Sequence, residues 1–163
     1  MISGMLTVTT VGGFFYLGKN RAESIITGVD SPVITISRAG NPMRYRDLNG
    51  EYQVCPARIT ITGSGFVSGG GGVIQGKEGT VRVSRYALRF DDVPFPMSDL
   101  PETGKKGNRL SGTLQVPVEL LTESEINKPR GFHVYDRTAA RFVKVAPETA
   151  AMVRFKMSEP IPR

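Results

Sequence analysis

Apolar and polar residues alternate along most of this chain. Ile34 and Ile36 flank Thr35, and Ile59 and Ile61 repeat the pattern farther along. Later alternating apolar sets are Leu114, Val116 and Val118, and then Val153, Phe155 and Met157. A period of two puts successive side chains on opposite faces, as in half-buried strands. We therefore expect an all-β fold, an antiparallel sandwich or barrel of jelly-roll or Greek-key type with long loops and extended terminal arms.

The clearest local prediction is a β-hairpin whose turn is Asn49-Gly50. Asn-Gly favours a two-residue type I′ turn, because both central residues need positive φ. That turn would pair Arg46 with Gln53. It would also gather the larger apolar and aromatic side chains on one side: Met43, Tyr45, Tyr52 and Val54.

Three further elements are predicted from pattern and turn chemistry. A second hairpin should join Phe132–Tyr135 to Arg141–Val145 across Asp136–Ala140. The apolar positions change from odd to even numbers near Ser84-Arg85, which predicts a β-bulge there. A short helix is predicted over Thr122–Asn127, where Ser/Thr–Glu spacing fits a capping box.

At 163 residues the chain is expected to form a single β domain over residues 1–163. Residues 1–20 read as an N-terminal arm or edge strands, because they lack the basic start and cleavage site of a secretion signal. Two segments read as irregular: a glycine-rich loop over 63–76 and a long Pro/Gly loop over 91–112. No apolar run reaches the length of a membrane-spanning helix.

Composition argues against an ordinary enzyme. The chain has one histidine, His133, and one cysteine, Cys55. Most hydrolytic, redox and transition-metal chemistry combines several imidazole or thiolate groups. We therefore expect no catalytic residue, no cofactor and no metal, with Cys55 a small buried apolar side chain. Asp91-Asp92 leave an oxygen-only Ca²⁺ site open, although turn formation explains them equally well.

Residues 71–77 carry most of the phosphate-binding G-x-x-x-x-G-K pattern. Glu78 follows where a hydroxyl should bind Mg²⁺, and Gly79–Val83 reads as a strand where a helix should begin. We interpret this stretch as a hairpin tip in which glycine supplies positive φ.

The formal net charge of +6 and the sequence pI near 9.7 favour an acidic partner. Some arginines are interleaved with aromatic residues, a mixture that can bind single-stranded nucleic acid. An amphipathic strand with one buried face explains the same mixture more simply. The candidate anion contacts are Arg44, Arg46, Arg82, Arg85 and Arg89.

These observations lead to the hypothesis of a non-enzymatic structural subunit of a large multimeric assembly. The expected setting is a virus or phage particle, as a capsid-decorating, neck or tail component; the resemblance is one of general character, without a family motif. Its location would be the virion after synthesis in a host cytoplasm, or otherwise the cytoplasm. The alternatives are a single-stranded nucleic-acid-binding OB-like module and a small ligand-binding β-sandwich.

The expected partners are copies of the chain or other subunits of the same assembly, with nucleic acid possible and no membrane. Subunit contacts would form through strand edges and loops. The candidate partner contacts are Phe66, Val67, Val73, Ile74, Phe95 and Met97.

Overall fold

The structure is a computed structural model that describes residues 23–37, 42–46, 50–76, 79–92, 96–147, 149 and 151–158. The expected N-terminal arm, the C-terminal end beyond residue 158, and Phe95 lie outside the described residues.

The first sheet is built around two long strands and contains six strands within the described residues. Its strands are β1 (Ile25–Val29), β3 (Met43–Arg46), β4 (Glu51–Ser64), β9 (Glu102–Thr103), β10 (Arg109–Pro117) and β13 (Lys144–Val145). Their order is β13-β1-β4-β10-β9, with β3 also paired to β4. The β1–β13 pair is parallel and the other pairs are antiparallel.

The second sheet also contains six strands in the described part of the chain. Its strands are β2 (Val33–Ile36), β7 (Tyr86–Phe90), β8 (Ser98–Asp99), β11 (Arg130–Asp136), β12 (Arg141–Phe142) and β14 (Met152–Met157). Their order is β2-β14-β11-β7-β8, with β12 on β11. The β2–β14 pair is parallel, so the arrangement is mixed and not purely antiparallel.

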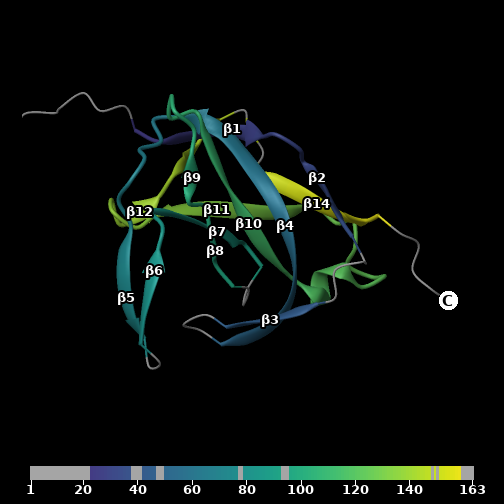
Figure 1. Cartoon of the computed structure of the whole chain (residues 1–163). Helices are drawn as coiled ribbons and strands as arrows, with labels where there is room; N and C mark the ends of the chain where they lie inside the picture. The colour runs from purple at the N-terminus through teal and green to yellow at the C-terminus, as the bar shows by residue number, and fades with distance from the viewer. Residues whose placement is uncertain are drawn as a thin grey trace, which may run out of the picture.

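The two sheets face each other across one hydrophobic cluster, and β4 and β10 arch over the second sheet (Figure 1). The cluster takes alternate residues from both sheets, including Ile59, Ile61, Leu110 and Leu114 from the first, and Leu88, Phe90, Phe132 and Phe155 from the second. This alternation is the one read from the sequence. The prediction of an all-β sandwich or barrel is confirmed.

The hairpin around Asn49-Gly50 exists, but its predicted register is wrong. Arg46 pairs with Glu51, so four residues connect the strands where two were expected. The observed register places Glu51 Oε2 3.3 Å from Arg44 Nε and 3.8 Å from Arg46 Nη2. It differs from the predicted one by two positions, so the predicted faces are retained.

The second predicted hairpin is confirmed, since Tyr135 pairs with Phe142 and Asp136 with Arg141. Its returning segment is split between sheets: β12 stays on β11, whereas β13 joins β1. The predicted bulge at Ser84-Arg85 is wrong. These two residues carry the chain from a separate two-stranded ribbon into the second sheet, and the change of sheet accounts for the change in parity.

The predicted helix over Thr122–Asn127 is also wrong. A 3₁₀ turn, η2 (Val118–Leu121), forms just before it, and residues 123–127 are turns. The Thr122 hydroxyl does not cap a helix start, because it donates to the Glu119 carbonyl at 3.3 Å. Among the described residues, no helix has the length and apolar character that a membrane span requires.

Both predicted irregular segments are more ordered than expected. The irregular part of the glycine-rich segment is only 65–71, because β4 ends at Ser64 and β5 begins at Gly72. The 91–112 segment contains β8, β9 and the start of β10. Gly112 belongs to β10, where an added Cβ would lie 2.3 Å from the Asp99 carbonyl oxygen. Glycine there permits a close backbone crossing and does not mark a loop.

Candidate functional site

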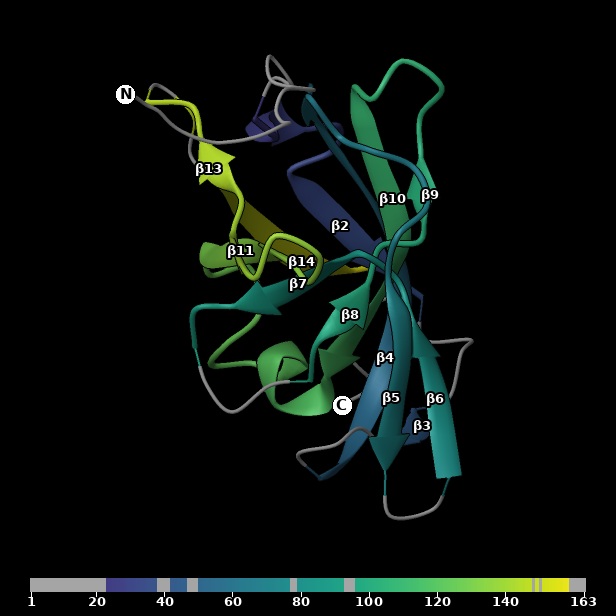
Figure 2. The same ribbon diagram turned by 90° about the vertical axis from the view of Figure 1, so that its left-hand side faces the viewer.

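A two-stranded ribbon projects from the sandwich and carries two of the candidate partner contacts. It consists of β5 (Gly72–Gly76) and β6 (Gly79–Val83), which pair with each other from Gly72↔Val83 to Gly76↔Gly79. Within the described residues neither strand joins another strand, so both outer edges lack a strand partner. Figure 2 shows the ribbon extending away from the second sheet. Gly79–Val83 was predicted as a strand, which is confirmed.

The two faces of the ribbon differ in chemistry. One face carries only apolar residues and glycines: Gly72, Ile74, Gly76, Gly79, Val81 and Val83. The other pairs Val73 with Arg82 and Gln75 with Thr80. Val81 is 53% exposed on the apolar face, and Val73 is 62% exposed on the mixed face. An isolated two-stranded hairpin is marginally stable in water, so the position of this ribbon depends on its attachment.

Glycines permit the tight entry into the ribbon. Gly69, Gly70 and Gly71 all have φ between +76° and +80°, a backbone conformation that residues other than glycine rarely adopt. At Gly71 an added Cβ would also lie 2.4 Å from the Val83 carbonyl oxygen. The backbone can therefore cross the end of β6 only because no side chain is present.

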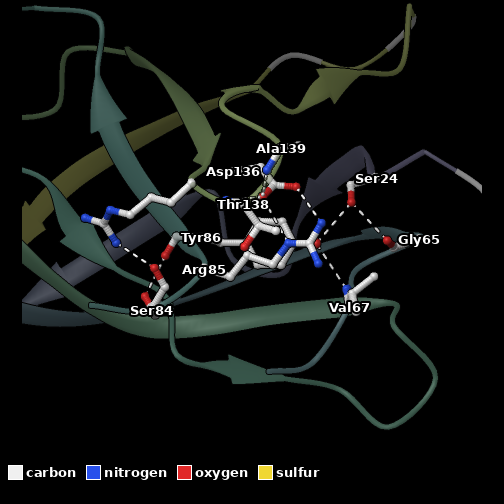
Figure 3. A network of polar contacts seen from close by, with 10 residues as sticks. Ser24, Gly65, Val67, Ser84, Arg85, Tyr86, Asp136, Thr138 and Ala139 are labelled. Carbon is white, nitrogen blue, oxygen red and sulfur yellow. Dashed lines mark hydrogen bonds and ion pairs between the residues drawn. The ribbon is translucent and has the colours of Figure 1, made fainter. Parts of the chain in front are cut away.

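A buried ion pair anchors the segment that leaves the ribbon (Figure 3). Arg85 donates through Nε to Asp136 Oδ1 at 2.9 Å and through Nη2 to Asp136 Oδ2 at 3.0 Å. The two side chains are 15% and 6% exposed. Asp136 Oδ1 also accepts the backbone N–H groups of Thr138 and Ala139, both at 3.0 Å. One carboxylate therefore holds both the ribbon base and the β11–β12 turn.

Burial opposes ionisation of Asp136, but the hydrogen bonds from Arg85 and Ala139 outweigh it. The pKa of the Asp136 carboxyl is consequently lowered from its ordinary value. The pKa of the Arg85 guanidinium is raised, chiefly by its hydrogen bond to Asp136. Both groups therefore remain charged together at neutral pH.

A second set of hydrogen bonds fixes Ser84, the residue directly after β6. Arg137 Nη1 donates to the Ser84 carbonyl at 2.7 Å and to Asp99 Oδ1 at 3.1 Å. The Ser84 N–H donates to Asp99 Oδ2 at 3.2 Å, and the Arg137 N–H donates to the Arg85 carbonyl at 2.8 Å. The exit from the ribbon is thus bonded to β8 and to the turn after β11.

Tyr86 fixes the segment that enters the ribbon. Its hydroxyl accepts the Val67 N–H at 3.0 Å and lies 3.1 Å from the Ser24 hydroxyl oxygen (Figure 3). Phe66 packs edge-on against the Tyr86 ring, with centroids 5.7 Å apart. Both ends of the ribbon are therefore tied to the sandwich. We call this set the base network: Ser24, Phe66, Val67, Ser84, Arg85, Tyr86, Asp99, Asp136 and Arg137.

A cleft of about 180 Å³ opens beside the base network. Its charged lining includes Arg85 with Asp136, and Lys144, whose Nζ lies 3.0 Å from Glu23 Oε2. Ligand pockets typically span about 300–1,000 Å³. The cleft is small, and these lining charges already have partners.

The candidate partner contacts do not lie together on one surface. Phe66 does not reach the surface: it is 5% exposed and part of the hydrophobic cluster, so its assignment as a partner contact is wrong. Val67 and Met97 are half-buried. Val73 and Ile74 lie on opposite faces of the ribbon. Sequence reasoning missed Val81, although the Gly76–Gly79 turn would have placed it opposite Ile74.

The candidate anion contacts do not form one site. Arg44 and Arg46 lie on β3 beside Glu51, whereas Arg82 is on the ribbon and Arg89 is exposed on β7. Arg85, the remaining candidate, is bonded to Asp136 in the base network and is therefore unavailable to an external anion. Tyr86 and Phe90 point into the core, as expected for an amphipathic strand.

His133 is exposed, and its Nδ1 contacts the Asp91 carboxylate. Its ring packs against Phe142 at 5.3 Å between centroids. Sequence reasoning did not find Asp91 as its partner, because the two residues lie on different elements. No group of three or more His, Cys, Asp or Glu side chains in the described part of the chain is placed to hold a metal ion. Cys55 is buried as predicted, and burial raises the pKa of its thiol.

No family model matches the sequence, and no match is found among curated proteins or among solved structures.

Proposed function

We propose that this chain is a non-enzymatic structural subunit of a multimeric assembly, and that its β5–β6 ribbon makes the principal contact with a neighbouring copy. The observation that supports this most is the combination found in the ribbon. It has two edges without a strand partner among the described residues, an uncharged face and a base held by a buried ion pair. Unpaired strand edges are templates for pairing with another chain.

The uncharged face suits contact between identical chains. Two copies can bring Ile74 and Val81 together without burying a charge, because Arg82 lies on the opposite face. The glycines add no side-chain bulk, so another backbone can approach closely. Anchoring at the base reduces the conformational entropy that association would otherwise cost.

The proposed setting is a virus or phage particle, with the chain as a capsid-decorating, neck or tail component in the virion. Support for this setting is general. A rigid β-sandwich with a projecting ribbon suits a shell or tube in which each subunit holds the next one.

The test compares Val81→Lys with Val73→Lys by size-exclusion chromatography coupled to light scattering, across a range of protein concentrations. Both residues are exposed on the ribbon, but they lie on opposite faces. Val81→Lys places a charge in the proposed interface and should weaken self-association by about 30-fold or more, the size of a hot-spot substitution.

Val73→Lys is the matched control, with the same change in size and charge and an expected effect of less than about 3-fold. Thermal melting should be nearly unchanged in both variants. A wild-type chain that remains monomeric at the highest concentration, or equal effects of the two substitutions, would contradict the proposal.

A further inference from the structure

The outer face of the second sheet gathers residues from four strands that are distant in the sequence. Cross-strand pairing places Arg89 beside His133, Tyr135 beside Phe142, and Gly131 beside Met152. The exposed residues of β14 continue the same face with Arg154 and Lys156. We call this set the outer stripe: Arg89, His133, Tyr135, Phe142, Met152, Arg154 and Lys156.

One end of the outer stripe is aromatic. Phe142 is 49% exposed, although exposed phenylalanine is costly in water. The Tyr135 ring meets it edge-on at 5.4 Å between centroids, and the His133 ring lies at 5.3 Å on a tilted plane. Three rings are thus held together on a rigid sheet, with part of the Phe142 surface open to solvent.

The cationic side chains lie along the rest of the stripe. Arg89 is opposite His133, and Arg154 and Lys156 are exposed on the outward side of β14. Counted along β14 and β11, the stripe from Lys156 to Tyr135 is about 26 Å long at about 3.3 Å per residue. That length suits a segment of about four nucleotides.

Two carboxylates near this face already have partners. Asp91 contacts His133 Nδ1, and Asp99 Oδ1 accepts from Arg137 at 3.1 Å. The Asp91 side chain lies directly over Gly131: a Cβ added to Gly131 would lie 2.3 Å from Asp91 Oδ2. Asp91 therefore lies within the stripe, where its negative charge would repel a bound anion.

We propose that the outer stripe binds single-stranded nucleic acid. Bases would stack on the exposed Phe142 ring, while Arg89, Arg154 and Lys156 contact phosphates. A purely electrostatic partner would not account for the exposed aromatic cluster. Duplex DNA fits less well, because its stacked bases offer no ring face to Phe142. The stripe does not include the ribbon, so this proposal and the assembly proposal are tested independently.

The experiment measures the binding of a fluorescently labelled oligothymidylate by anisotropy at several salt concentrations. The full-length wild-type chain should bind, and its affinity should fall as salt rises. Phe142→Leu keeps an apolar side chain but removes the ring, and should weaken binding by about 5- to 150-fold with little change in salt dependence. The double variant Arg154→Gln/Lys156→Gln should reduce the slope of log K against log salt by about 1.4.

Two further variants complete the test. Asp91→Asn removes the carboxylate from the stripe and should strengthen binding. Arg82→Gln removes one cation from the ribbon and should leave the affinity for oligothymidylate nearly unchanged, with thermal melting confirming that every variant is folded.

Several results would overturn the proposal: no saturable binding at physiological salt, an unchanged affinity in Phe142→Leu, or tighter binding to a duplex of the same length. Equal affinity for polyglutamate would also overturn it, since it would indicate an acidic protein as the partner of this face.

Discussion

Asp136→Ala should lower the free energy of unfolding by about 3–5 kcal/mol, measured by urea denaturation at neutral pH. The substitution leaves the guanidinium of Arg85 buried without its bidentate partner, and it also removes the acceptor for two backbone N–H groups. For a chain of this size the midpoint of thermal unfolding should fall by roughly 6–20 °C. The ribbon base should loosen at the same time, because Arg85 lies only two residues beyond Val83, the last residue of β6.

A matched control removes a carboxylate whose ion pairs are exposed. Glu51→Ala eliminates the contacts with Arg44 and Arg46 on the hairpin and should cost less than about 1 kcal/mol. Replacing both members of the buried pair, with Arg85→Met and Asp136→Leu together, should restore much of the stability lost in Asp136→Ala. A loss below about 1 kcal/mol in the single variant would show that the pair does not hold the ribbon base.

The contribution of Asp136 should also depend on pH. Its carboxyl has a lowered pKa in the folded chain, so folding favours the ionised form. The stabilisation is fully present above the ordinary pKa of 3.8 and is lost as the pH falls through the lower folded value. The stability difference between wild type and Asp136→Ala should therefore be constant near neutrality and shrink in strongly acidic solution.

Phe155→Ala should have an effect of similar size, about 3–5 kcal/mol in the free energy of unfolding. Phe155 is 1% exposed and packs edge-on against Phe90 with centroids 5.7 Å apart. It lies on β14, the strand that joins β2 to β11, so the cavity would open where the second sheet is held together. Met152→Ala on the exposed side of the same strand is the control, with an expected cost below about 1 kcal/mol. Equal costs for the two variants would contradict the burial pattern of β14.

The alternation of apolar residues was sufficient to predict the fold class, because a half-buried strand repeats its pattern every two residues. Phe155 illustrates this, since its place between Arg154 and Lys156 is enough to identify the buried face of the strand. Registers were harder to predict. The Asn49-Gly50 turn chemistry favours a two-residue loop. The structure instead has a four-residue loop, in which Glu51 pairs with Arg46 and forms an ion pair with Arg44.

The base network could not be predicted from the sequence. Ser24, Val67, Tyr86 and Asp136 are brought together only by the order of strands in two sheets, and no local pattern encodes that order. Arg85 was instead grouped with the anion contacts, because its burial depends on a partner 51 residues away. The outer stripe was missed for the same reason: its residues adjoin across strands and not along one.

Hydrogen exchange of the ribbon amides during self-association is the most direct test of the ribbon as the contact between copies. An isolated two-stranded ribbon should exchange quickly, whereas strands that pair with a neighbour are protected. We predict that protection over Gly72–Val83 rises with protein concentration, while protection in β4 and β10 stays constant. If the chain associates and the ribbon amides exchange as fast in the assembly as in the monomer, then the ribbon does not make the contact and the proposal is wrong.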